Sequence, residues 1–123
     1  MKQLLLVFLG GGFGSSLRYV ISKYLNESQL GVPYGTLFVN ILGSLIIGFL
    51  LGLAFKYKTI SNETMLILAT GFCGGFTTFS AFVYENYIYF RSGDYFSLGV
   101  YTLVSLVVGI VAVIFGIWMV KFI

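Results

Sequence analysis

Charged residues divide this chain into long stretches that carry no charge, at 3–17, 28–55, 64–84 and 95–120. A helix needs about 20 apolar residues to cross the hydrocarbon core of a bilayer. The last three stretches are long enough, and the first is long enough if its helix continues past Arg18 to about Ile21. The pattern predicts an all-α integral membrane protein, a single domain over residues 1–123 with four transmembrane helices at about 4–22, 33–54, 64–88 and 96–120.

Composition supports a membrane protein, because 59% of the residues are hydrophobic and only 9% are charged, whereas soluble domains carry about 25% charged residues. Lys2 and the apolar run 4–9 resemble the start of a cleaved signal peptide, but the span continues to Arg18 and we expect it to be retained. We expect a multi-pass protein of the cell (inner or plasma) membrane, surrounded by lipid, with no nucleic-acid partner. Without His, and with Cys73 alone, a transition-metal site is not expected.

Positive charges are almost equally divided between the two sides of the predicted membrane domain. Four helices place both termini on one side, with Lys2, Lys56, Lys58 and Lys121. The other side carries Arg18, Lys23 and Arg91. Because an excess of positive charge normally fixes orientation, this chain is predicted to insert both ways up and to form an antiparallel two-fold homodimer.

The third predicted helix contains a segment that disfavours a regular helix. Gly71–Phe82 holds three glycines and three hydroxyl residues; glycine weakens a helix, and Ser and Thr side chains compete for its backbone bonds. Freed backbone groups at membrane depth survive only where they are buried or line a polar cavity, and they are ready ion ligands. The pattern predicts a mid-membrane break at the functional centre.

Three of the predicted helices carry polar or aromatic residues on one face. These sets are Thr36, Asn40 and Ser44; Phe79, Phe82 and Glu85; and Tyr101, Ser105 and Gly109. Neutral donors and acceptors can replace part of an ion's hydration shell and still release the ion, as conduction requires. Phenylalanine edges can contact an anion, and backbone carbonyls suit a hard cation such as Na⁺.

Two polar residues within the spans have alternative interpretations. Arg18, a charge within the first predicted span, either extends to the membrane interface or attracts anions at a pore vestibule. Asn40 either makes an interhelical hydrogen bond or contacts an ion. Small residues at four-residue spacing predict close helix packing; the pairs are Gly10 and Gly14, Gly48 and Gly52, and Ala112 and Gly116.

Gly71–Phe82, together with 35–44 and 10–19, resembles the small bacterial fluoride channels called Fluc or CrcB, over the whole chain. The resemblance implies passive fluoride export, which lowers cytoplasmic fluoride, by a dual-topology dimer with two pores. It also implies a central structural Na⁺, not transported, held by the backbone carbonyls of Gly74 and Thr77 from each subunit. The residues that match the family's pore are Asn40, Phe79 and Phe82, with Tyr101 and Ser105 on its polar track; Thr36 is a further pore candidate. Gly109 and Ala81 depart from the family's pattern.

Other classes fit the chain less well. A small multidrug exporter needs a carboxylate in its first helix, and here no acidic residue precedes Glu27. A membrane assembly subunit that transports nothing would use the glycines for packing alone. An enzyme is not expected, because no candidate general base lies inside the membrane. The choice of fluoride over chloride depends on the resemblance.

Overall fold

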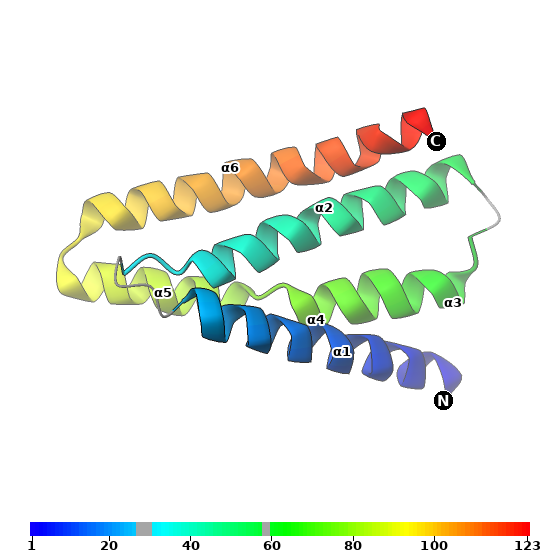
Figure 1. Ribbon diagram of the computed structural model, residues 1–123, viewed down its shortest axis with the longest axis horizontal. Coiled ribbons are helices and arrows are strands. Elements are labelled where there is room, and N and C mark those ends of the chain that lie inside the picture. The colour runs from blue at the N-terminus through cyan, green and yellow to red at the C-terminus, as the bar shows by residue number, and fades with distance from the viewer. Residues whose placement is uncertain (27–30, 58–59) are drawn as a thin grey trace.

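The computed structural model describes residues 1–26, 31–57 and 60–123, and the regular elements in these ranges are all helices. The first two spans are α1 (Lys2–Leu25) and α2 (Tyr34–Lys56). The third span consists of α3 (Asn62–Met65), the π-helix η1 (Leu66–Cys73), α4 (Gly74–Phe76) and α5 (Phe79–Ser92). The fourth consists of α6 (Tyr95–Met119) and the 3-10 helix η2 (Val120–Phe122). Both termini lie at the same end of the bundle (Figure 1).

Four spans in the described ranges are long and apolar enough to cross a membrane: Lys2–Leu25, Tyr34–Lys56, Asn62–Ser92 and Tyr95–Phe122. The ends of the last two are set by local hydrogen bonds. Ser61 accepts a hydrogen bond from the Thr64 N–H at the start of α3, and Asp94 accepts one from the Ser97 N–H at the start of α6. Between α5 and α6, Gly93 has a φ of 78°, which an L side chain rarely adopts. These caps place the turns where the charged residues had indicated them.

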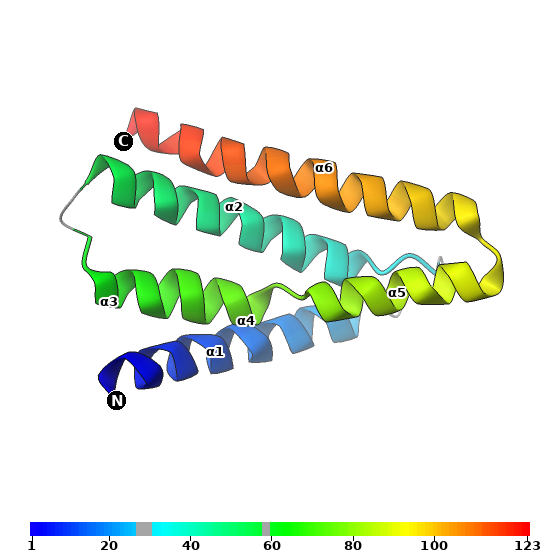
Figure 2. The same ribbon diagram turned by 180° about the vertical axis from the view of Figure 1, so that it is seen from behind.

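The four spans pack as two main pairs. α2 lies along α6, and α1 lies along η1 and α4, as the two opposite views show (Figures 1 and 2). The glycines lie at these contacts, as predicted: a Cβ on Gly14 would come 2.9 Å from the Phe76 nitrogen, and one on Gly48 would come 2.8 Å from the Val113 Cα. In the α2–α6 pair a Cβ on Gly116 would also come 2.7 Å from the Phe49 nitrogen. The absence of side chains lets the helix backbones approach closely.

The break in the third span is at Thr77 and Thr78, close to the middle of Asn62–Ser92. Thr77 (φ −83°, ψ 156°) and Thr78 (φ −146°, ψ 114°) are extended. The break lies within the predicted segment Gly71–Phe82, but its glycines do not form it, because Gly71 and Gly75 are helical and pack against α1. Their helical conformation needs no unusual dihedral angle; what requires glycine is the neighbouring backbone of Gly10 and Gly11.

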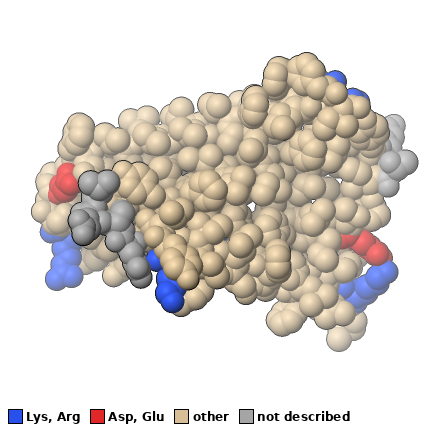
Figure 3. Space-filling view, viewed as in Figure 1, with Lys and Arg blue, Asp and Glu red and all other residues tan. Residues whose placement is uncertain are grey.

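Charged side chains gather near the two ends of the bundle and leave a surface without charged side chains between them on the face shown (Figure 3). Lys2 and Glu63 form an ion pair of 2.6 Å that joins the starts of α1 and α3. Of the lysines counted on the terminal side, Lys58 lies outside the described residues, as does Glu27. Long apolar side chains such as Phe8, Leu103 and Ile110 are more than half exposed, as expected for a lipid-facing surface.

Candidate ion-binding cavity at the helix break

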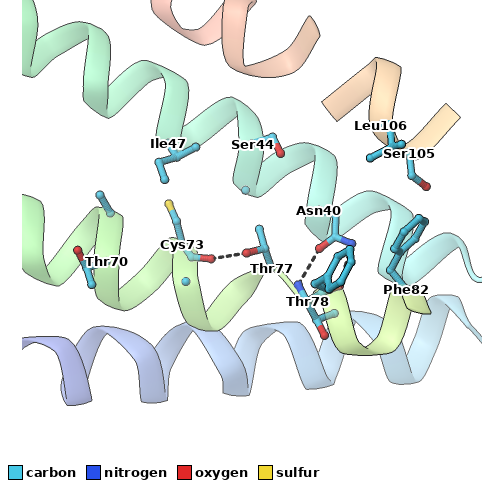
Figure 4. Close-up of a pocket in the computed structure, with 14 residues that line it drawn as sticks. Asn40, Ser44, Ile47, Thr70, Cys73, Thr77, Thr78, Phe82, Ser105 and Leu106 are labelled. Carbon is cyan, nitrogen blue, oxygen red and sulfur yellow. Dashed lines mark hydrogen bonds between the residues drawn. The ribbon is translucent and has the colours of Figure 1, made fainter. Parts of the chain in front are cut away.

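A cavity of about 400 Å³ lies beside the break, between α2, the third span and α6. It extends from Phe82 past the break toward Ile47 (Figure 4). The predicted site residues that line it are Asn40, Gly74, Thr77, Phe79, Phe82 and Ser105. Ser44, Thr70, Cys73 and Thr78 add polar groups, and the lining residues include no charged side chain. Thr36, Tyr101 and Arg18, which were also predicted for the site, lie outside this lining.

Asn40 joins α2 to the backbone at the break (Figure 4). Its Oδ1 accepts a hydrogen bond of 2.7 Å from the Thr78 N–H, and its Nδ2 donates one of 3.1 Å to the Thr78 carbonyl. The amide therefore supplies the two partners that an uninterrupted helix would have supplied. Of the two interpretations of Asn40, the interhelical hydrogen bond is present, and the same side chain lines the cavity.

The carbonyls of Gly74 and Thr77 are left without their regular helical donors at the break. Their helical donors would be the N–H groups of Thr78 and Ala81, but these donate to the Asn40 Oδ1 and the Thr78 Oγ1 instead. Neither carbonyl therefore receives the hydrogen bond of its regular helical donor. A carbonyl left unpaired in a membrane is unfavourable unless a ligand or water binds it, and a pair of such oxygens fits a hard cation such as Na⁺.

The residues that precede the break differ in how far they are exposed. The Thr77 hydroxyl donates to the Cys73 carbonyl at 2.9 Å, so that side chain is already engaged. Cys73 and Phe76 are buried, whereas Gly74 is exposed, and a Cβ there would meet nothing within 4 Å. The backbone oxygen of Gly74 thus belongs to a residue on the open surface of the monomer.

Arg18 binds the end of the first half of the broken helix. Its Nε donates to the Gly75 carbonyl at 3.1 Å, and the Ser15 hydroxyl donates to the same oxygen at 3.3 Å. A positive charge stabilises the carboxyl end of a helix. Arg18 therefore has a partner at the break through its Nε, and the two interpretations of this residue, extension to the membrane interface and a vestibule role, both stay predictions. Ser15 was missed, since nothing in sequence spacing indicates a partner 60 residues away.

The two predicted pore phenylalanines lie side by side at the start of α5. Their ring centroids are 5.9 Å apart with an interplanar angle of 39°. Phe82 is 9% exposed, whereas Phe79 is 74% exposed. The Phe82 ring also lies 5.4 Å from the Tyr101 ring, at 46°. Aromatic rings carry partial positive charge at their edges, and both phenylalanines line the cavity.

Thr36 and Tyr101 meet at a carboxylate, in a group that we call the Glu85 cluster: Asn26, Thr36, Glu85 and Tyr101. The Thr36 Oγ1 donates to the Glu85 Oε1, and the Tyr101 hydroxyl donates to the Glu85 Oε2 at 2.6 Å. Thr36 is 1% exposed and Tyr101 5% exposed. Helical spacing predicted Glu85 on the face of Phe79 and Phe82 but did not indicate its partners, and Asn26 was not among the predicted site residues.

Ser105 is the polar side chain with an unmet hydrogen bond in the cavity. Its Oγ is buried and, within the described residues, has no partner. Buried hydroxyls are normally paired, so this one has a donor and acceptor available to a ligand or water. One turn further along α6, a Cβ on Gly109 would lie 3.8 Å from the Ser44 Oγ, which leaves room for a small side chain at that departure from the family's pattern.

Comparisons with known proteins agree over nearly the whole chain. The family model described as "CrcB-like protein, Camphor Resistance (CrcB)" matches residues 5–117. A protein of Hyphomonas neptunium (strain ATCC 15444) named "Fluoride-specific ion channel FluC" is 47% identical and covers 98% of this chain and 97% of its own length. A protein of Gloeothece citriformis (strain PCC 7424) with the same name is 46% identical over 98% of both chains.

Proposed function

The chain belongs to the CrcB-like family, and from this premise we propose that it is a fluoride channel. It lets fluoride leave the cell passively through the inner (plasma) membrane and so lowers the cytoplasmic concentration. Such a protein is a multi-pass membrane protein, with four spans of the required length and apolarity. It carries an ion and catalyses no reaction.

The uncharged cavity beside the break is the observation that supports conduction. Its lining combines the Asn40 amide, the Ser105 hydroxyl and the rings of Phe79 and Phe82. These groups can donate to, or contact, an anion that has lost part of its water. None of them carries a charge, so none would hold the anion too tightly for release. We assign these four residues to the fluoride path, with Thr36 and Tyr101 beside it in the Glu85 cluster.

We propose that the working unit is an antiparallel homodimer with two pores. The exposed Gly74 and Phe79 at the break support this, because Phe79 lines the cavity and is nevertheless 74% exposed, so that one copy alone leaves most of its ring uncovered. Positive charges divided almost equally between the two sides also favour insertion in both orientations. Lysines added to one end alone should trap the chain in one orientation without activity, and co-expression with an oppositely biased variant should restore activity.

Gly74 and Thr77 would hold one structural Na⁺ at the centre of this dimer. The support is the lack of regular helical donors to their carbonyl oxygens. When bound, Na⁺ would supply a fixed positive charge that binds the two breaks together and is not transported. The four oxygens of two copies would offset part of the loss of hydration of the ion.

Fluoride efflux from liposomes tests the proposal. Purified protein is reconstituted into vesicles loaded with potassium fluoride, and a fluoride electrode records release after valinomycin is added. We expect rapid release of fluoride, and no release of chloride from matched vesicles. A multidrug-type exporter would instead move a cationic dye in exchange for protons, and an assembly subunit would move neither ion. Equal release of fluoride and chloride, or release of neither, would refute a fluoride channel.

A further inference from the structure

Asn26, at the end of α1, holds the first residues of α2. Its Oδ1 accepts hydrogen bonds from the N–H groups of Gly35 at 2.7 Å and Thr36 at 3.3 Å. A Cβ on Gly35 would come 2.7 Å from this oxygen, so the glycine permits the close approach. Through these two bonds Asn26 acts as a remote cap for α2, whose own N-cap residue Pro33 makes no side-chain capping bond.

The other half of the same amide acts on the Thr36 side chain. The Asn26 Nδ2 donates to the Thr36 Oγ1 at 3.3 Å, and that hydroxyl donates onward to the Glu85 Oε1. A hydroxyl has one proton. Because the N–H of Asn26 occupies an acceptor position of the Thr36 oxygen, the single proton of Thr36 points away from Asn26 and toward Glu85.

The direction of this proton decides whether Glu85 is fully paired. With Thr36 on Oε1 and Tyr101 on Oε2, both carboxylate oxygens accept a hydrogen bond. Tyr101 in turn packs its ring 5.4 Å from Phe82, which borders the cavity. A carboxylate oxygen that lost its donor would be costly in these surroundings. The Glu85 side chain would then turn toward another donor, and its negative charge would repel an anion in the path.

We propose that Asn26 is a positioning residue for fluoride conduction. It acts through the Thr36 hydroxyl, whose proton it directs onto Glu85, and it does not touch the ion. This inference rests on the proposed channel function and adds to it a residue at the end of α1, outside the cavity. It separates two roles of one side chain, since the amide oxygen caps α2 and the amide nitrogen orients the hydroxyl.

Asn26→Asp removes the second role and keeps the first. The aspartate can still accept from the N–H groups of Gly35 and Thr36, but it has no N–H to donate, so the Thr36 proton turns toward residue 26. We expect the melting temperature in detergent to stay within about two degrees of the wild type. Fluoride efflux should fall about tenfold, the factor that corresponds to the loss of one ordinary hydrogen bond.

A double-mutant cycle identifies the route of the effect. In a Thr36→Val background, which has the same shape but no hydroxyl, Asn26→Asp should cause no further loss of flux. In a Thr36→Ser background, which keeps the hydroxyl, the full loss should return. A loss of flux that is equal in the Val and Ser backgrounds would overturn the inference, because the effect of residue 26 would then not pass through the Thr36 hydroxyl.

The wild-type protein separates this inference from the function on which it rests. If wild-type vesicles release no fluoride, the proposed channel function is wrong. If they release fluoride and Asn26→Asp releases it at a rate within twofold of the wild type, the channel function stands and the positioning role of Asn26 is wrong.

Discussion

Two adjacent glycines at the break should respond in opposite ways to the same substitution. Gly75 faces α1, and a Cβ there would lie 2.9 Å from the Gly11 Cα and 3.0 Å from its carbonyl carbon. Gly74 faces outward, and a Cβ there would meet nothing within 4 Å. Both residues are helical. Gly75→Ala should therefore destabilise the monomer, whereas Gly74→Ala should not.

The expected difference follows from the distances. Carbon atoms in contact normally lie about 3.5–4.0 Å apart, so an alanine at Gly75 must push α1 and α4 apart by roughly 0.5–1 Å. Overpacking of this kind costs about 1–3 kcal/mol. The gain in helix propensity, up to about 1 kcal/mol, applies to both glycines and cancels in the comparison. Gly75→Ala should be less stable than Gly74→Ala by about 1–3 kcal/mol.

Unfolding of the two variants in detergent, at a concentration where light scattering shows monomers, measures this difference. Gly74→Ala should match or exceed the wild type, and Gly75→Ala should unfold first. Equal stability of the two variants would refute the packing of α1 on α4 described here. The same position separates folding from assembly: Gly74→Val should keep the monomer fold and lose the dimer if the breaks of two copies cross at Gly74.

Further outcomes concern the fluoride path, at the phenylalanines and Asn40, and the proposed Na⁺ site. Phe79→Ile and Phe82→Ile keep bulk but remove ring edges, so fluoride efflux should fall by more than about tenfold while gel filtration still shows a dimer; normal efflux would remove both rings from the path. Asn40→Asp keeps the acceptor for the Thr78 N–H, loses the donor to its carbonyl and adds a charge, so efflux should stop, whereas Asn40→Gln would be expected to retain part of it. Thr77→Ser preserves the backbone and the hydroxyl, so a structure of this variant should still show density for Na⁺ between the two copies, and density for water alone would exclude the ion. Replacing Na⁺ on both sides of the membrane by a bulky organic cation should reduce fluoride efflux.

The spans could be predicted from the sequence because a transmembrane helix depends on residues that are consecutive along the chain. A helix that crosses lipid needs an uninterrupted apolar run, and the charged residues that end each run are visible in the sequence. Packing glycines were also predictable, since residues four apart share a face. The location of the break was only approximate: Gly71 and Gly75 looked like helix breakers, but a close neighbouring helix accounts for them, and Thr77 and Thr78 leave the helix instead.

The partners of the site residues could not be predicted, because they depend on distance in space. Asn40, Phe82 and Ser105 were predicted as pore residues, and they line one cavity beside the break, yet nothing in the sequence indicates that Asn40 binds the backbone of Thr78. The same holds for Glu85, which joins Thr36 from α2 to Tyr101 from α6. A carboxylate within a span must be paired there, so Glu85 in the sequence already indicates polar partners on neighbouring helices.

The break also divides the third span between two neighbours that are synthesised at different times. Its first half, Asn62–Phe76, lies mainly along α1, while α5 lies mainly along α6. Translation produces α1 before this span and α6 after it. In a continuous helix, packing of the first half on α1 would also fix the direction of the second half before α6 is present. With two extended residues in its middle, the first half can pack on α1 without fixing the direction of the second half, which is free to pack on α6 once that helix has entered the membrane.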